Sequence, residues 1–226
     1  MPHLALPTLA SYLRPRGVQV IQRDLNLEVF EEILTRRHLE EATSRLRSEA
    51  APRAGGARSR PTLPRDGLEW ALARGPDVAA EVEGAVEVIR SPAFLDGPGG
   101  LRAFLAIVEA LAIASLPFHP SSLELTRFVP PVPVESSRAL LRAVREPRAN
   151  MFLDIFRTGV IRDIERERPQ IVGISISTMD QMLAGMTLAH LIREARLPCH
   201  VTVGGPHVTM LREQLHRVPG LFDLVD

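Results

Sequence analysis

The sequence has no lysine, no net charge and a single cysteine. All 27 basic residues are therefore arginine, and 27 acidic residues match them, so the formal net charge is zero. A protein that binds nucleic acid or an anionic membrane surface usually carries a basic excess, so the charge balance argues against both classes. Cys199 alone forms no internal disulfide and cannot by itself hold a zinc ion or an iron–sulfur cluster. We expect it to be a buried strand thiol.

Long hydrophobic runs are also scarce. The most apolar stretch, residues 101–116, is predicted to be a buried core helix, because it is too short to span a bilayer and carries Arg102 and Glu109. The start of the chain has neither a basic segment nor a long apolar run, which argues against a signal peptide. With 226 residues, 45% of them hydrophobic, the sequence predicts a globular protein with a sizeable core, and we expect a cytoplasmic location.

The clearest pattern lies in the last third of the chain. Residues 171–176 form a nearly continuous β-branched run, typical of a parallel strand that is buried on both faces. Residues 179–196 have the apolar periodicity of a helix, which Pro198 ends. Residues 201–203 predict a second strand. The order strand, helix, strand predicts a right-handed βαβ unit.

Small and polar residues follow both strands of this unit. Ser175, Ser177 and Thr178 lie at the end of the first strand, and Gly204, Gly205 and Pro206 lie at the end of the second. In open parallel sheets, ligands bind outside the carboxyl ends of the strands. We therefore expect a binding site at this edge.

The rest of the chain is predicted to be mainly helical. Helices are expected over residues 4–14, 27–47, 68–73, 78–90, 101–116, 136–145 and 150–168, with Gly75-Pro76 separating two of them. Strands are expected over residues 18–24 and 221–225. Asp24 and Asn26 end the first of these strands, where they would either face the ligand edge or, as we favour, cap the next helix.

These elements predict an α/β fold, with a Rossmann- or flavodoxin-like parallel sheet and a large helical insert. Residues 1–26 contribute the first helix and strand of the α/β domain, and residues 150–226 contribute its βαβ core. Residues 27–149 form the insert, with a mobile loop near residues 48–66, where alanine, proline, arginine and glycine dominate. A strand before the first helix is expected in such a sheet and is missing.

The ordered set of motifs resembles the cobalamin-binding domain of cobalamin-dependent radical S-adenosylmethionine enzymes. The resemblance rests on residues 171–177, 181–189, 200–207 and 222–225, and on residues 4–13, Gly17 and residues 23–26 at the start of the chain. It covers residues 4–26 and 150–225.

The resemblance implies a Rossmann-like sheet that holds the corrin and its nucleotide tail at the strand ends. Ser175 matches a serine that bonds the dimethylbenzimidazole tail, and Gly204 and Gly205 match paired glycines that let the tail pass close to the backbone. The implied cobalamin-binding residues are Ser175, Ser177, Thr178, Met179, Gln181, Gly204, Gly205, Pro206 and His207. We expect Gly205→Leu to abolish binding and to leave the fold largely intact. No catalytic residue and no protein ligand of a metal is predicted.

The sequence departs from that family in two ways. The Asp-x-His-x-x-Gly motif that supplies an axial histidine is absent, as it often is in radical members of the family. The Cys-x-x-x-Cys-x-x-Cys motif is absent too, so S-adenosylmethionine and an iron–sulfur cluster would belong to a missing or partner domain. We therefore expect a chain that is not a complete enzyme alone and is apparently truncated before the radical domain, although a stand-alone module stays an alternative.

Three functions remain open. The favoured one is the cobalamin-binding module of a cobalamin-dependent radical S-adenosylmethionine enzyme, for methyl transfer or related chemistry, with a radical domain or subunit as its partner. The second is a degenerate structural or interaction domain of the same fold without ligand. The third is a flavodoxin-like domain that binds a flavin or nucleotide, which the lack of a Gly-x-Gly-x-x-Gly motif disfavours.

Overall fold

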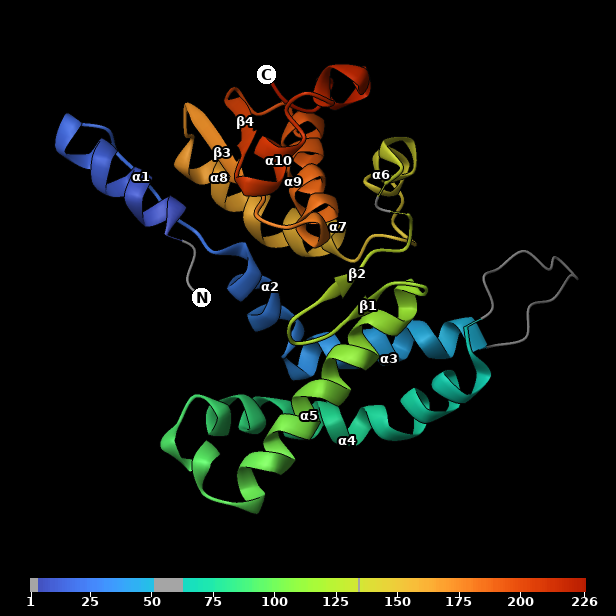
Figure 1. The fold of residues 1–226 in the computed structure, drawn as a ribbon. Helices are drawn as coiled ribbons and strands as arrows, with labels where there is room; N and C mark the ends of the chain where they lie inside the picture. The colour runs from blue at the N-terminus through green and yellow to red at the C-terminus, as the bar shows by residue number, and fades with distance from the viewer. Residues whose placement is uncertain (1–3, 51–62, 134) are drawn as a thin grey trace, which may run out of the picture.

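The computed structural model describes residues 4–50, 63–133 and 135–226. Helices α2 to α5 form one part of the molecule, and the strands β3 and β4 with helices α7 to α10 form the other (Figure 1). Of the loop predicted near residues 48–66, residues 51–62 lie outside the described residues. On either side of them, α3 continues to Ala50 and α4 begins at Arg65, so helices enter both ends of the predicted loop.

The chain begins with the predicted helix, but the strand predicted after it does not form. Helix α1 (Ala5–Leu13) and the 3₁₀ helix η1 (Arg14–Arg16) end at Gly17, which has a φ of 78°. No strand of the described sheets pairs with residues 18–24, so Val18 and Ile21 are 45% and 55% exposed. The strand prediction was wrong because β-branched residues form a strand only where a neighbouring strand satisfies their backbone.

The insert contains α2 (Leu25–Ile33), α3 (Arg36–Ala50) and α4 (Arg65–Ile89). The predicted break at Gly75-Pro76 was wrong, because α4 continues through Pro76. Gly75 is buried against α3, where a Cβ atom would lie 2.7 Å from the Thr43 hydroxyl. Buried residues continue along α4 on both sides of the proline, so packing against α3 and α5 outweighs the local cost of Pro76.

Helix α5 (Pro98–Ser115) is buried on one face only, which corrects the prediction of a helix buried all round. Leu101 and Leu105 are 62% and 50% exposed. The apolar stretch also continues through η3 (Leu116–Phe118), so the expectation that it is too short to span a bilayer was wrong. By length and composition alone, Pro98–Phe118 is long and apolar enough to cross a membrane, and half of it is buried inside the fold. The core helix of a soluble protein meets the same criterion. The cytoplasmic location stays a prediction.

Several short elements connect α5 to the βαβ unit. They are η3, the antiparallel strands β1 (Ser122–Leu123) and β2 (Phe128–Val129), α6 (Ser137–Ala143), α7 (Phe152–Ile155), the π-helical turn η4 (Phe156–Val160) and α8 (Ile161–Glu167). The 3₁₀ helix η2 (Pro92–Leu95) precedes α5. The helix expected over residues 136–145 forms as α6, and Ser136, rather than the alternative Ser137, caps it by accepting a hydrogen bond from Ala139 N. From the apolar spacing after Asn150 we expect Leu153, Phe156, Val160 and Ile164 to share one face, and the first three are buried while Ile164 is partly buried against the core.

The βαβ unit forms as predicted. Strands β3 (Ile171–Ser175) and β4 (His200–Gly204) are parallel, and η5 (Met179–Gln181) and α9 (Met182–Glu194) connect them. The two strands form a small parallel sheet by themselves, within a structure that is otherwise mostly helical. This arrangement is consistent with a Rossmann-like α/β domain but does not establish the wider sheet that the sequence predicted.

Two details of the predicted sheet were wrong. Strand β3 is not buried on both faces: Ile171 is 63% exposed, because β3 pairs only with β4 in the described sheet. Residues 221–225 are not a strand either, because η7 (Pro219–Leu221) and the turn after it take up most of that segment. Only Asp226 reaches β4, where its N–H donates to Val201 O at 2.9 Å. Helix α10 (Pro206–Met210) and η6 (Leu215–Arg217) lie between β4 and η7.

Candidate functional site

The carboxyl ends of β3 and β4 lie side by side and bring most of the predicted site together. Ser175 and Gly204 are partners in the ladder, which continues for one more bond from Ile176 N to Gly204 O at 2.8 Å. His207 N then donates to Ile176 O at 3.3 Å. The start of α10 is therefore held against the segment that follows β3.

The loop after β3 is fixed by Gln181. Its Oε1 atom accepts a hydrogen bond from Ser177 N at 2.8 Å, and its backbone N–H donates to Thr178 O at 3.1 Å. Thr178 and Met179 are exposed beside it, and Pro206 is exposed at the start of α10. The structure thus places all nine predicted residues in the segments that follow the two strands or at the last residue of each strand.

The two adjacent glycines have different surroundings. Gly205 has a φ of +100°, and a Cβ atom there would lie 2.8 Å from Ile176 N, so this position requires glycine for the fold itself. A Cβ atom on Gly204 would meet nothing within 4 Å. The expectation that Gly205→Leu leaves the fold intact was therefore wrong, and Gly204 is the glycine that faces open space.

Asn26 joins this edge from the start of α2 and was not among the predicted site residues. Gln181 Nε2 donates to Asn26 Oδ1 at 3.2 Å, across 155 positions of sequence. Asp24 caps α2, as favoured from the sequence, by accepting hydrogen bonds from the N–H groups of Asn26 and Leu27. The one signal for Asn26 was its place at the end of the expected first strand.

Charged groups gather at the opposite, amino end of β4. Asp226 accepts a hydrogen bond from Val201 N at 2.8 Å and pairs with Arg193 at 2.6 Å. These contacts hold the pKa of the Asp226 carboxyl below its ordinary value. Cys199, one residue before β4, is half-buried rather than fully buried, and burial raises the pKa of its thiol. The contacts of Asp226 therefore attach the last residues of the chain to the amino end of β4 and to α9.

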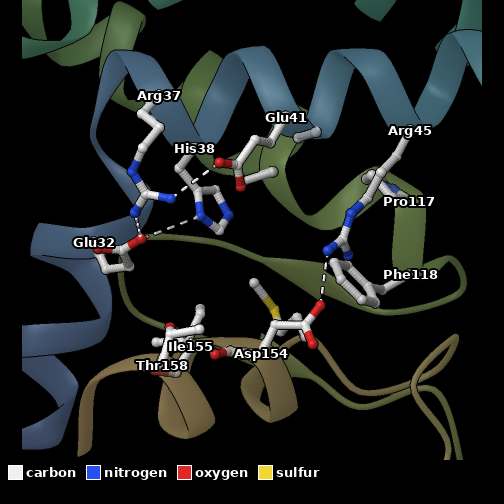
Figure 2. A pocket seen from close by; sticks show the side chains of 13 residues that line it. Glu32, Arg37, His38, Glu41, Arg45, Pro117, Phe118, Asp154, Ile155 and Thr158 are labelled. Atoms are coloured by element: carbon white, nitrogen blue, oxygen red, sulfur yellow. Dashed lines mark hydrogen bonds and ion pairs between the residues drawn. The ribbon is translucent and has the colours of Figure 1, made fainter.

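A small hollow lies elsewhere, between α3, η3 and α7 (Figure 2). Its charged side chains are paired, since Arg45 contacts Asp154 at 2.7 Å and Arg37 contacts Glu41 at 3.0 Å. Its volume of about 90 Å³ is well below the roughly 300–1,000 Å³ of pockets for drug-sized ligands. None of the nine predicted residues lines it, and its small volume leaves no room for a corrin.

One comparison with known proteins gives a match, and it covers the part of the chain that contains the parallel sheet. Residues 130–225 match the family model of the B12 binding domain. The range matched by the B12 binding domain begins after β2 and contains β3, α9, β4 and all nine predicted residues. The match supports a cobalamin-binding domain in this part of the chain, with cobalamin as its cofactor. The chain matches no curated protein and no solved structure.

The edge is compatible with a bulky, flat ligand. Such a ligand needs small residues and accessible backbone where it meets the protein. Gly204 provides an open approach to the end of β4, and half-buried Ser175 lies beside it on β3. The residues present therefore fit cobalamin.

Proposed function

We propose that this chain is the cobalamin-binding part of a cobalamin-dependent radical S-adenosylmethionine enzyme, and that the nucleotide tail of cobalamin lies at the carboxyl ends of β3 and β4. The match of residues 130–225 to the B12 binding domain supports the cofactor. The observation that carries the position is the open space at Gly204, next to Ser175. The radical enzyme context rests on the sequence resemblance alone.

The residues at this edge have separate tasks in the proposed site. The Ser175 hydroxyl bonds the tail, and Gly204 lets the tail approach the backbone without meeting a side chain. Ser177, Thr178, Met179, Pro206 and His207 surround the approach, while Gln181 holds the loop and Gly205 holds the turn. When bound, cobalamin supplies a cobalt centre that carries a methyl group or takes part in radical chemistry. S-adenosylmethionine and the iron–sulfur cluster belong to another domain or subunit, and we place the reaction in the cytoplasm.

Titration of the purified chain with hydroxocobalamin tests the proposal. We expect a shifted visible spectrum and co-elution of the cobalamin with the protein on a sizing column. A folded protein that binds no cobalamin across the micromolar range contradicts the proposal. Parallel titrations with flavin mononucleotide and with a nicotinamide dinucleotide distinguish cobalamin from the ligands of a flavodoxin-like domain.

A structural or interaction domain without ligand is the second candidate, and the open edge of β3 favours it. Ile171 is 63% exposed on a strand that carries no charged residue. Such an edge offers unpaired backbone groups to another chain. Association that increases with protein concentration, together with no cobalamin binding, supports this second function over the first.

A further inference from the structure

A line of amide groups connects the loop after β3 to the start of α2. Gln181 accepts from Ser177 N at 2.8 Å and donates to Asn26 Oδ1 at 3.2 Å. Asn26 Nδ2 in turn donates to Asp24 Oδ1 at 3.2 Å. Four residues from two distant segments thus share one continuous set of hydrogen bonds.

The Ser177 N–H group at one end and the Asp24 carboxylate at the other determine which atom donates in each hydrogen bond between them. The Ser177 backbone N–H can only donate, so the Gln181 atom that faces it must be the amide oxygen. The Asp24 carboxylate can only accept, so the Asn26 atom that faces it must be the amide nitrogen. Both remaining amide atoms then have the correct polarity for the bond between Gln181 and Asn26. A single arrangement of the two amides satisfies all three contacts.

The Asn26 side chain is not needed to begin α2. Asp24 already caps the helix by accepting from the backbone N–H groups of Asn26 and Leu27 at 3.0 and 3.4 Å. The same end of α2 is also held by Arg23, which pairs with Glu28 and, at 3.0 Å, with Asp163 of α8. The Asn26 amide is therefore available to act on Gln181 from a well-anchored position.

We propose that Asn26 is a positioning residue of the cobalamin site, which holds the loop of residues 177–179 in place through Gln181. This inference rests on the proposed function, because the loop matters for binding only if cobalamin occupies this edge. Asn26 lies in the first turn of α2, whose residues from Leu27 onward belong to the insert, so its contact links the first helix of the insert to the site. The sequence range matched by the B12 binding domain does not include Asn26.

The test compares Asn26→Ala, Gln181→Ala and the double variant with the wild-type chain. Each is titrated with hydroxocobalamin, and amide hydrogen exchange at Ser177 is measured without ligand. We expect Asn26→Ala to bind about threefold to tenfold more weakly, as for the loss of one hydrogen bond to the loop. Gln181→Ala should bind at least as weakly as Asn26→Ala, because it loses both side-chain hydrogen bonds of Gln181. The double variant should bind no more weakly than Gln181→Ala, because Asn26 acts through Gln181. Exchange at Ser177 should be faster in all three.

Gln22→Ala is the matched control, since Gln22 is another exposed amide on the segment before α2. Gln22→Ala should leave the affinity for hydroxocobalamin and the amide hydrogen exchange at Ser177 unchanged. If the wild-type chain binds and Asn26→Ala alters neither its affinity nor exchange at Ser177, the inference is wrong while the proposed function stands. If the wild-type chain does not bind, the proposed function and the role in binding fail together, and exchange at Ser177 then reports only on the loop. A lower melting temperature of Asn26→Ala with unchanged exchange at Ser177 would show a role in α2 alone and would also overturn the inference.

Discussion

Gly204 and Gly205 are adjacent, but only Gly205 has a backbone conformation and a packing environment that require glycine. Gly205 combines a φ of +100° with a backbone contact that leaves no room for a Cβ atom, whereas Gly204 has a conformation open to other residues and empty space beside it. Motif matching treats the pair as one feature, because the sequence Gly-Gly does not show which residue turns the chain. The structure assigns the turn to Gly205 and the open approach to Gly204.

This difference predicts that Gly205→Ala destabilises the protein and Gly204→Ala does not. A side chain forced into a left-handed conformation costs about 1–3 kcal/mol, and the contact with the Ile176 backbone adds to this cost. Gly204→Ala should change the free energy of unfolding by less than about 0.5 kcal/mol. Urea unfolding of both variants measures the difference, and equal stabilities would show that Gly205 is not held as described.

We expect the free energy of unfolding to depend on pH because His38 is partly buried. Burial lowers the pKa of its imidazole from the usual value of 6.5, although Glu32 and Glu41 pull that pKa upward. The folded protein then binds fewer protons at His38 than the unfolded chain does, so stability falls as the pH drops below about 6.5. His38→Gln should reduce this slope in unfolding experiments between about pH 5 and pH 7.5. His190, whose pKa is also lowered, leaves a residual slope, and a variant with the full slope contradicts the account.

Helices and strands differed in how well the sequence predicted them. Helices α2, α3 and α9 follow from apolar periodicity, because a helix satisfies its own backbone and needs only one apolar face. The strands expected over residues 18–24 and 221–225 depend on a neighbour in space, which periodicity does not reveal. The unbroken α4 was missed for a related reason, since its continuity depends on packing at Gly75 against Thr43.

The residues of the candidate site also differ in how well the sequence predicted them, according to whether their contacts are local or distant in sequence. Ser175, Gly204 and their neighbours were found together because the βαβ unit is local and its strand ends must meet. Asn26 was missed as a site residue because its contact with Gln181 joins segments 155 positions apart. No rule of composition or spacing connects two such exposed amides.

Asn150 connects helix α9 of the βαβ unit to the segment that precedes α7. It is 1% exposed, and its amide donates to Val144 O at 3.2 Å and to Thr187 Oγ1 of α9 at 2.7 Å, while its oxygen accepts from Phe152 N at 3.1 Å. Asn150→Ala removes the hydrogen bonds to the buried Val144 O and Phe152 N, while Thr187 Oγ1 keeps its bond to Leu183 O, so it should destabilise the protein by about 2–4 kcal/mol. Thermal and urea unfolding measure the loss. A change below about 0.5 kcal/mol would mean that other contacts hold α7 and α9 together.

At the scale of the whole molecule, two of the contacts that join helices α2 and α3 to the βαβ part are made by polar side chains. Arg45 of α3 pairs with Asp154 of α7 beside the hollow of Figure 2, at 2.7 Å. Asn26 reaches Gln181 next to the candidate site. The first ion pair is about half exposed, so it contributes little stability, roughly 0–1 kcal/mol. The second contact lies beside the edge proposed to bind the ligand, so we expect α2 to act on the site there.

The central claim is that cobalamin binds at the carboxyl ends of β3 and β4, and Gly204→Val tests it most directly. Gly173→Val is the matched control, because Gly173 lies on the same small sheet, two residues before Ser175, and a Cβ atom there makes only an ordinary contact of 3.9 Å with Thr202. Hydroxocobalamin affinity is measured by visible absorbance, with the melting temperature of each variant. We predict that Gly204→Val stays folded and binds at least about tenfold more weakly, while Gly173→Val binds like the wild-type chain. Unchanged affinity in a folded Gly204→Val, or an equal loss in both variants, would contradict the assignment of this edge.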